Sequence, residues 1–557
     1  MAEKKRIITG GNAVAVVVIT IISAVVLNLI MARVPVPFDL TENKIFTLSD
    51  ASKEVVGNLE EPVEVKVFIS SDMPPPFHTL AQQVNDLLAD YQSASGGKLT
   101  YQIIQPSSDD EEAEEAARGF GIEKVGIGTE SEDEVALRAV YKGVAFVMGD
   151  KVEVIADLRT TGSVEFDNFE YDFTKALMNL TLKESRKLAF ASGFGGPGSQ
   201  PGFAEGIRPT FKQLYGDLVE VSVEDISDGE VAEDIDALVI LNFSEPVSAK
   251  GKFAIDQFLQ RGGSVGWYQS ASGLDEQLMR QFAQQMGPNA RMPDIRRPLN
   301  HGLEDLFKVY GIELRKDTVL DRKNALALGL VMTEQGLARV SHPASFLMTD
   351  IDRELPFTRD IYAIGMPAPS SMVLLPSVAE SKDLEGFEVV RTSDVAVRRP
   401  TPPQSLNYQD LSQPAADESP GPFVVAAALQ GELPSWLESN PIPEGMSEEN
   451  VVKEKKPARV LVVGSADFFQ PNPQLGFNEQ LAGFGGQFLI SSLEWLVQDN
   501  ALTNIRGKSL PRLIGDVPKS EQRRVQLMNI VFVPLFFGVL GWTILQLRRR
   551  RKDKIIL

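Results

Sequence analysis

A glycine-rich loop is the first feature of this sequence whose residue types could do chemistry. Residues 193–198 read GFGGPG and match the G-x-G-x-x-G pattern of dinucleotide-binding folds. In those folds a helix starts inside the motif, so that its amide groups meet the pyrophosphate. Here Pro197 and Pro201 postpone the helix. We therefore do not expect a nucleotide site at this loop.

A second motif, at residues 262–266 (GGSVG), matches the nucleophile elbow G-x-S-x-G. That elbow requires a turn from a strand into a helix, whereas Ser264 is expected between a helix and a strand. We interpret the match as chance. The sequence also lacks the phosphate-binding pattern G-x-x-x-x-G-K-[ST], so this chain is not expected to hydrolyse nucleotide itself.

The amino-acid composition excludes several kinds of catalytic site. The chain of 557 residues has no cysteine, which excludes thiolate nucleophiles, cysteine metal ligands and disulfides. Its three histidines, His78, His301 and His342, lack the spacing of metal ligands, so we expect surface or core roles for them. We find no paired acid, metal set or triad, and we predict no catalytic residue, no metal and no cofactor.

One constellation remains as a candidate binding site. Loops 193–198, 242–245 and 464–467 each follow a predicted strand, and ligands of open parallel sheets bind beyond the carboxyl ends of the strands. These loops could therefore meet at one crevice. The alternative is that Asn242, Ser244 and Asp467 cap helices. The candidate ligand- or partner-binding residues are Gly193, Phe194, Gly195, Gly196, Asn242, Ser244, Ser465 and Asp467.

The elements that must position these loops form an alternating pattern. Strands are predicted at 188–191, 218–223, 237–241, 264–268 and 459–463, and helices around 211–215, 250–260 and 479–498. Alternation of this kind predicts a parallel sheet with helices on its faces. Residues 270–451 contain proline-rich turns and are expected to form insertions or a flexible lobe.

An earlier unit is expected to begin with a β-α-β pattern. Ser49 or Asp50 should cap a helix over 51–59, strands are predicted at 63–69 and 99–104, and a helix is predicted at 77–91 between them. Residues 135–140, 143–148 and 151–155 suggest an antiparallel meander. A helix over 166–179 then closes the unit.

Two apolar segments at the chain ends predict membrane anchors. Residues 12–32 follow Lys4, Lys5 and Arg6, and residues 526–547 precede five cations at 548–552. Since both basic flanks lie on the chain-end side, the positive-inside rule places both termini in the cytoplasm and the bulk outside the bacterial inner membrane. The alternatives are a cleaved signal peptide for the first segment and a buried core helix for the second.

The predicted organisation therefore has seven parts. They are a cytoplasmic tail (1–11), a transmembrane helix (12–32), an extracytoplasmic α/β domain (33–185), a second α/β domain (186–500, with an insertion at about 270–451), a juxtamembrane linker (501–525), a second transmembrane helix (526–547) and a basic cytoplasmic tail (548–557).

The charge balance restricts the partners of the exterior part. Formal net charge is −21, from 76 acidic and 55 basic residues, and the cations crowd the two ends. The exterior part is consequently more acidic still. This argues against DNA, RNA or an anionic lipid surface as its ligand.

Several short segments, together with the two apolar spans, resemble the GldG-type auxiliary component of gliding-motility-associated ABC transport systems. These segments are 39–41 (DLT), 46–49 (FTLS), 236–240 (DALVI), 258–263 (FLQRGG), 464–468 (GSADF) and 493–496 (LEWL). The resemblance covers most of the chain from residue 33 onward. Members often carry a Gly-His-Gly-Glu-like loop where this sequence has SGFGG at 192–196, which speaks against chemistry at that loop.

The resemblance implies an α/β fold class, with two extracytoplasmic α/β units flanked by two transmembrane helices. The second unit would be a parallel-sheet glutamine-amidotransferase-like or flavodoxin-like fold without a nucleophile, since amidotransferases of that type use a cysteine. The implied role is a non-enzymatic auxiliary subunit beside an ABC permease and a separate ATPase, with other envelope proteins as further partners. The alternatives are a structural envelope or motility scaffold without transport and a membrane-tethered hydrolase.

Overall fold

The computed structural model describes most of the chain between its two ends. The described residues are 47–74, 77–106, 111–131, 134–158, 169–286, 295–333, 336–359, 361–400, 405–472, 475, 477–497, 539 and 541–543. By internal contacts the chain divides into Met1–Ser509 and Leu510–Leu557. Among the described residues, no helix combines the length and apolarity needed to cross a bilayer. The predicted spans 12–32 and 526–547 lie outside the described residues, apart from 539 and 541–543.

A small sheet with flanking helices forms the N-terminal part. Its strand order is β2-β1-β5-β6, with β1 parallel to β2 and antiparallel to β5. The side chain of Ser49 accepts a hydrogen bond from the Ser52 amide and caps the first helix, as predicted. The elements of this part are α2 (Asp50–Gly57), β1 (Val63–Ile69), α3 (Leu80–Ala94), β2 (Leu99–Ile104), α4 (Glu111–Gly119), β3 (Val125–Ser131), β4 (Glu134–Val140), β5 (Lys142–Met148), β6 (Lys151–Ile155) and α5 (Phe169–Thr181).

The predicted meander is only partly correct. Strands β5 and β6 pair as an antiparallel hairpin, but β4 pairs with β3, a strand that the sequence did not predict. Side-chain periodicity identifies a strand but not its neighbour, and this is why the partner of β4 was assigned wrongly.

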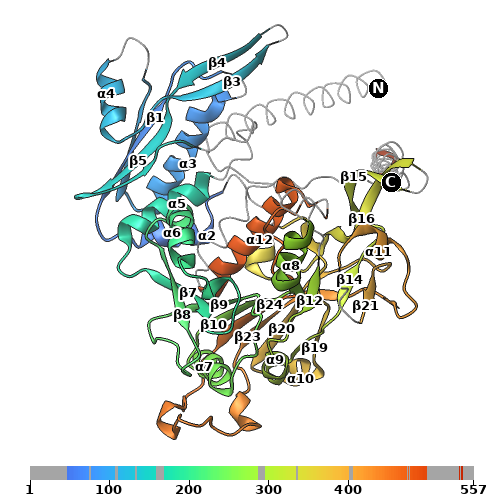
Figure 1. The fold of residues 1–557 in the computed structure, drawn as a ribbon. Helices are drawn as coiled ribbons and strands as arrows, with labels where there is room; N and C mark the ends of the chain where they lie inside the picture. The colour runs from blue at the N-terminus through green and yellow to red at the C-terminus, as the bar shows by residue number, and fades with distance from the viewer. Residues whose placement is uncertain are drawn as a thin grey trace, which may run out of the picture. The chain divides into compact units, whose positions relative to one another are not determined.

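The larger sheet has a parallel centre that runs β8-β7-β9-β10-β24 (Figure 1). Numbered along the chain, this order is 2-1-3-4-5, which is the order of flavodoxin-like folds. The predicted strands and their parallel sheet are therefore confirmed. The strand order is new information, because periodicity does not show which strands are neighbours. The elements are β7 (Arg186–Ser192), α6 (Phe203–Tyr215), β8 (Val219–Asp225), β9 (Ala237–Leu241), α7 (Ala249–Gln260), β10 (Ser264–Tyr268), β24 (Ala458–Val463) and α12 (Glu479–Leu496).

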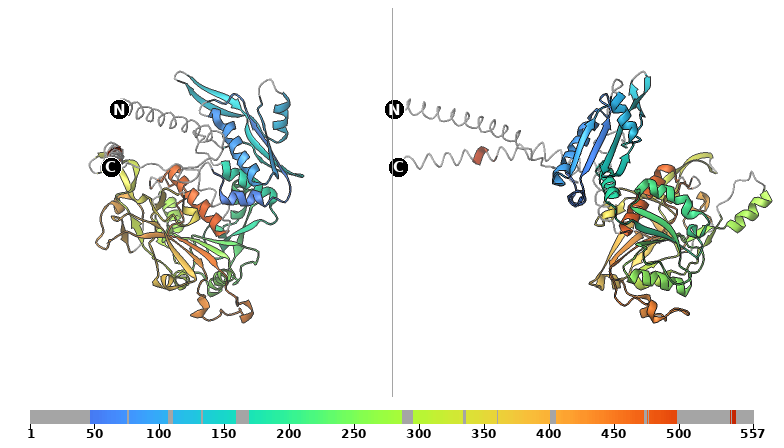
Figure 2. Two further views of the ribbon diagram at one scale, coloured as in Figure 1. Left: turned by 180° about the vertical axis from the view of Figure 1, so that it is seen from behind. Right: turned by 90° about the vertical axis from the view of Figure 1, so that its left-hand side faces the viewer.

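Residues 270–451, expected as insertions or a flexible lobe, lie between β10 and β24 in the chain. Five of their strands extend this same sheet, and their other strands form separate small sheets. Strand β23 pairs antiparallel with β24, and β19, β13, β20 and β17 continue the sheet outward, so that ten of the described strands belong to it. Figure 2 shows from two further sides how strands from distant parts of the chain lie together. The elements of this region are β11 (Ser272–Leu274), α8 (Glu276–Met286), β12 (Arg296–Pro298), α9 (Glu304–Tyr310), β13 (Ile312–Leu314), β14 (Thr318–Leu320), β15 (Ala325–Thr333), β16 (Gly336–Met348), β17 (Asp350–Ile351), β18 (Ile364–Pro367), β19 (Met372–Leu374), α10 (Pro376–Glu380), β20 (Leu384–Arg391), β21 (Val397–Arg399), α11 (Tyr408–Ser412), β22 (Ser419–Pro420) and β23 (Val424–Gly431).

Helices cover both faces of the parallel centre. In β9 all five residues are buried. Leu238 and Ile240 pack into the cluster that contains α7 and α9, while Val239 and Leu241 pack into the cluster that contains α12. Burial on both faces explains why this strand reads as a continuous apolar run rather than an alternating one.

Helix α5 links the N-terminal part to the larger sheet. Its residues Phe169, Phe173 and Leu177 belong to the core of the small sheet. Tyr171 instead packs into the core of the larger sheet, and its hydroxyl donates to Glu494 Oε1 of α12 at 3.0 Å. The predicted domain boundary at residue 185 therefore follows a helix whose side chains serve both cores.

A buried carboxylate connects the elements on the face of the sheet that α7 covers. Asp256 of α7 is fully buried and accepts hydrogen bonds from the Tyr310 hydroxyl at 2.9 Å, the Ser435 hydroxyl at 2.8 Å and the Trp436 amide at 2.7 Å. Burial raises the pKa of Asp256, and these hydrogen bonds oppose that shift. One side chain thus joins α7, α9 and the segment that leads toward β24.

Replacing Asp256 with alanine should destabilise the protein by about 3 kcal/mol or more, because the buried donors Tyr310 Oη, Trp436 N and Gln257 Nε2 would lose their acceptor. Urea unfolding of the purified protein, followed by tryptophan emission, measures this loss. The matched control is Asp228→Ala, since Asp228 is exposed, and it should change stability by less than about 0.5 kcal/mol. Equal midpoints for the two variants would contradict the role given to Asp256.

Candidate functional site

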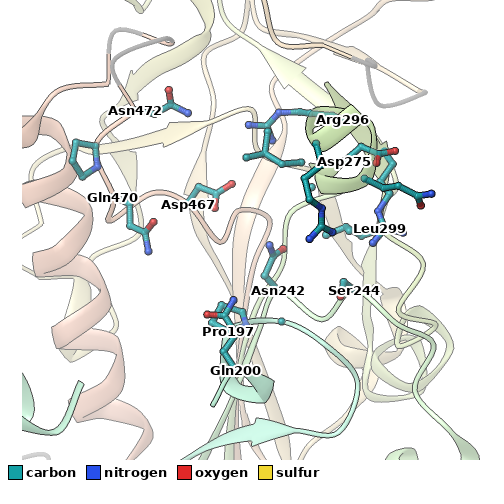
Figure 3. A pocket seen from close by; sticks show the side chains of 17 residues that line it. Pro197, Gln200, Asn242, Ser244, Asp275, Arg296, Leu299, Asp467, Gln470 and Asn472 are labelled. Carbon is teal, nitrogen blue, oxygen red and sulfur yellow. The ribbon is translucent and has the colours of Figure 1, made fainter. Parts of the chain in front are cut away.

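A cavity of about 610 Å³ opens beyond the carboxyl ends of the parallel strands. Its wall includes Gly196 from the loop after β7, Asn242 and Ser244 from the loop after β9, and Asp467 from the loop after β24 (Figure 3). The three loops that the sequence singled out therefore do meet at one place. Ligand binding by them stays a prediction.

The position of the cavity follows from the strand order. The chain leaves β7 toward β8 on one side and returns to β9 on the other, so the loops after β7 and β9 diverge there. Open α/β sheets bind ligands at such a switch point, outside the carboxyl ends of the strands. The cavity size also lies within the usual range of small-molecule sites.

Four of the predicted site residues do not line the cavity. Gly193, Phe194, Gly195 and Ser465 are absent from its wall. They act instead on the loops that carry the lining residues. Position in a loop could be read from the sequence, whereas the part of each loop that faces the cavity depends on contacts with other loops.

Phe194 fixes the glycine-rich loop to the loop after β9. Its carbonyl accepts hydrogen bonds from the amides of Ser244 at 3.3 Å and Glu245 at 3.1 Å. Its ring is buried and meets the edge of Phe243, with ring centroids 5.8 Å apart. Phe194 is therefore a positioning residue for Ser244.

Gly196 lies where the two loops approach most closely. Its φ of 77° is in the left-handed region. A Cβ at this position would meet the Leu241 carbonyl oxygen at 2.6 Å and the Asn242 carbonyl oxygen at 2.9 Å. Only glycine fits between these backbone atoms without a shift.

The helix after the glycine-rich loop begins late, as predicted. Residues 197–199 form a single 3-10 turn, and α6 starts at Phe203. The Gly193 amide donates to the Ser199 hydroxyl at 3.2 Å, and that hydroxyl donates to the Gly195 carbonyl at 2.9 Å. The loop is thus closed on itself, and α6 begins after the motif rather than inside it, as a dinucleotide site would require.

Asn242 joins the loops after β9 and β10. It adopts a left-handed φ of 49°, which asparagine tolerates better than most residues. Its Oδ1 accepts from the Ser270 amide and from Gln269 Nε2, each at 3.3 Å. Its amide group Nδ2 has no partner among the described residues and remains available to a ligand.

Helix capping, the alternative for Asn242, Ser244 and Asp467, does not occur at the helices that follow them. Helix α7 is capped by Ser248 and α12 by Asn478. Within the described part of the chain, the Ser244 hydroxyl makes no hydrogen bond.

Ser465 and Ser270 set the position of Asp467. The buried Ser465 hydroxyl donates to the Pro367 carbonyl at 3.3 Å and accepts from the Asp467 amide at 3.4 Å. The Ser270 hydroxyl accepts from the Ala466 amide at 3.0 Å and lies 3.5 Å from Asp467 Oδ2. Ser270 was not predicted, because nothing in the local sequence shows that β10 and β24 are neighbours.

Three arginines in the cavity wall were also missed. They are Arg280 of α8 and Arg296 and Arg297 of β12. Figure 3 shows the Arg296 side chain among those that surround the cavity, together with Asn242 and Asp467. The adjacent pair at 296–297 is a signal that the sequence contained, but the expected separate lobe around it concealed its place beside the sheet.

The remaining candidates for chemistry lie elsewhere. His301 and His342 are buried, and His78 is exposed in a short turn, in agreement with prediction. Desolvation, the main cause, lowers the pKa of His301 to about 4. Ser264 of the GGSVG motif begins β10, so it lies at the amino end of the strands, away from the cavity. The part of the chain that the structure describes contains no cluster suited to a metal ion.

Comparison with known proteins gives two family matches. A sequence model of the family described as "ABC-type uncharacterized transport system" matches residues 185–491. A domain of unknown function matches residues 42–147. The first match contains the parallel sheet and every residue of the cavity wall.

Similarity to individual proteins is distant. An uncharacterized protein of Borreliella burgdorferi is 21% identical over 529 residues, which is 92% of this chain and 93% of that protein. Among solved structures, the IFT52 N-terminal domain has 11% identity and a TM-score of 0.31, covering 56% of this chain and 97% of that one. A ThuA-like protein from Bacteroides uniformis has 15% identity and a TM-score of 0.28, covering 57% and 94%. TM-scores this low do not support a fold assignment. The assignment therefore rests on the strand order of this chain alone.

Gly196→Ala should destabilise the protein more than Gly202→Ala, by at least about 1 kcal/mol. Both glycines have nearly the same φ, 77° and 78°, so both variants bear the left-handed backbone cost of about 1–2 kcal/mol. Only at Gly196 would the new Cβ meet backbone atoms, since nothing lies within 4 Å of it at Gly202. Thermal or urea unfolding compares the two. Equal losses would show that the close approach of the loops is not a constraint.

Proposed function

Because the chain belongs to the family described as an ABC-type uncharacterized transport system, we propose that it is a non-enzymatic auxiliary subunit of such a system. The observation that carries the proposal is that the family match at residues 185–491 contains the whole cavity at the switch point of the sheet. The role proposed for this cavity is to bind a ligand that the transport system moves or senses. The finer assignment, a GldG-type component serving gliding motility, rests on the sequence resemblance.

Separate subunits would supply the energy and the pore. ATP hydrolysis by ABC systems needs a phosphate-binding loop, and this sequence has no G-x-x-x-x-G-K-[ST] pattern. The proposed partners are therefore an ATPase and a permease. The absence of cysteine supports a role without amidotransferase-type catalysis.

The proposed location is the bacterial inner membrane, with the bulk of the chain outside the cytoplasm. The support comes from the sequence: apolar runs at 12–32 and 526–547 carry their basic flanks on the chain-end side. In this arrangement the permease would contact the spans, while the cavity would face the periplasmic or extracellular side.

Extraction in a mild detergent should recover the tagged chain together with an ATPase and a permease. After reconstitution, adding the chain should change the ATPase turnover, because an auxiliary subunit acts on the transport cycle. An unrelated inner-membrane protein with the same tag serves as the control. Recovery of a clean monomer would contradict the proposal, and recovery of both partners with unchanged turnover would favour a structural scaffold.

Protease added to intact spheroplasts should digest the region between the two apolar runs and spare epitope tags placed at both termini. The tags should be lost only after the spheroplasts are lysed, which controls for protease activity. A central region that survives in intact spheroplasts would rule out the proposed topology.

A further inference from the structure

The charged residues of the cavity wall are mostly engaged within the protein. Arg280, Arg296 and Asp467 each have a partner in the structure. Asp275 Oδ1 accepts a backbone amide of α8 at 3.0 Å and so caps that helix. Arg297 is exposed, and water and salt screen its charge. Selection of a ligand therefore falls to the neutral groups of the wall.

The neutral polar side chains of the wall still have hydrogen-bonding groups without partners. Asn242 uses its Oδ1 on Ser270 and Gln269, so the group left to a ligand is the donor Nδ2. The Ser244 hydroxyl makes no hydrogen bond within the described part of the chain. Among the described residues, three side-chain carboxamides of the wall are likewise without a hydrogen-bond partner, those of Gln200, Gln277 and Gln470.

These groups come from four separate segments. Gln200 follows β7, and Asn242 and Ser244 follow β9. Gln470 follows β24, and Gln277 belongs to α8. Figure 3 shows four of the five, Gln200, Asn242, Ser244 and Gln470, among the side chains that line the cavity. Polar groups that converge from several segments on one cavity are typical of a site that orients a small ligand.

Hydrogen-bond donors and acceptors are mixed in this set. A carboxamide carries an NH2 donor beside a carbonyl acceptor, and a hydroxyl both donates and accepts. An ionised carboxylate only accepts and an ammonium group only donates, so either ligand group would leave part of the set unused. Hydroxyl groups on a ligand can pair with both kinds.

Few of the lining side chains are apolar. Small-molecule sites are usually lined mainly by apolar and aromatic groups, whereas the residues of this wall other than glycine are mostly polar or charged. A polar ligand is thereby favoured. The apolar side chains that are present could pack against the C–H groups of a sugar ring, and they are Pro197, Leu274, Leu299 and Pro471.

From these groups we infer that the cavity binds a neutral, hydroxyl-rich ligand, namely a saccharide. The inference rests on the proposed function for the existence of a ligand and adds its chemical class. A free mono- or disaccharide and a saccharide unit of an envelope glycan present the same ring hydroxyls. The two sources differ in whether the isolated sugar binds.

The test uses the full chain purified in octaethylene glycol monododecyl ether, a detergent without a sugar headgroup. An array of immobilised neutral oligosaccharides probes glycans, with sialylated and sulfated members as the charged comparison. Isothermal titration with glucose, galactose, mannose, N-acetylglucosamine and maltose probes free sugars. We expect saturable binding of a neutral saccharide in at least one of the two experiments, and no tighter binding of the charged members.

Variants connect the binding to the cavity. Ser244→Ala combined with Gln470→Ala should weaken the binding of the active saccharide at least about tenfold, because two hydrogen bonds to it are lost. Neither side chain bonds to the rest of the described chain, so thermal unfolding without sugar should match that of the unaltered protein. Gln213→Ala is the matched control, since Gln213 is exposed on α6 and lies outside the cavity.

Three results would each overturn the inference: no neutral saccharide bound in either experiment, tighter binding of the charged glycans, or equal affinity in the double variant and Gln213→Ala. Binding on the array alone would support it and identify a glycan as the source, whereas binding in the titration would support it with a free sugar.

The outcomes also separate the ligand class from the proposed function. A chain that is recovered with the ATPase and the permease but binds no neutral saccharide would keep the proposed function and reject only the ligand class. Saccharide binding that depends on Ser244 and Gln470, in a chain that recovers neither partner, would keep the ligand class and reject the subunit role.

Discussion

The parallel pairing of β10 with β24 is the interaction on which the site depends. Backbone pairs run from Val265 with Val460 to Tyr268 with Val463, and the Gln269 amide continues the ladder to the Val463 carbonyl at 3.0 Å. This register brings the loop after β24 beside Ser270. Without it, Asp467 would have no fixed relation to the loops after β7 and β9.

Close backbone contacts hold the loops after β7 and β9 in place. The glycine-rich loop packs against residues 241–245 through Phe194 and Gly196, and Asn242 links that segment to Ser270. Each contact uses main-chain atoms on at least one side. Main-chain contacts fix position closely because they leave few rotamers free, and such rigidity favours a preformed binding cavity.

The long insertion has two separate effects on the larger sheet. Its strand β23 covers the edge of β24 and continues the sheet in antiparallel pairing, which protects an otherwise open edge. Its first hairpin, β11 with β12, contributes Arg296 and Arg297 to the cavity wall.

The sequence by itself determined the elements and the loops that carry the candidate site. Strands 63–69, 99–104, 237–241 and 264–268 were predicted with the bounds that the structure shows, because apolar runs and alternation are local properties. The late start of α6 followed from prolines in the same way. Only the tertiary structure decided the partner of β4, the joining of β23 to β24 and the presence of three arginines in the cavity wall that contains Asn242. Those outcomes depend on pairing between distant segments, which is set by packing and register rather than by the residues nearby.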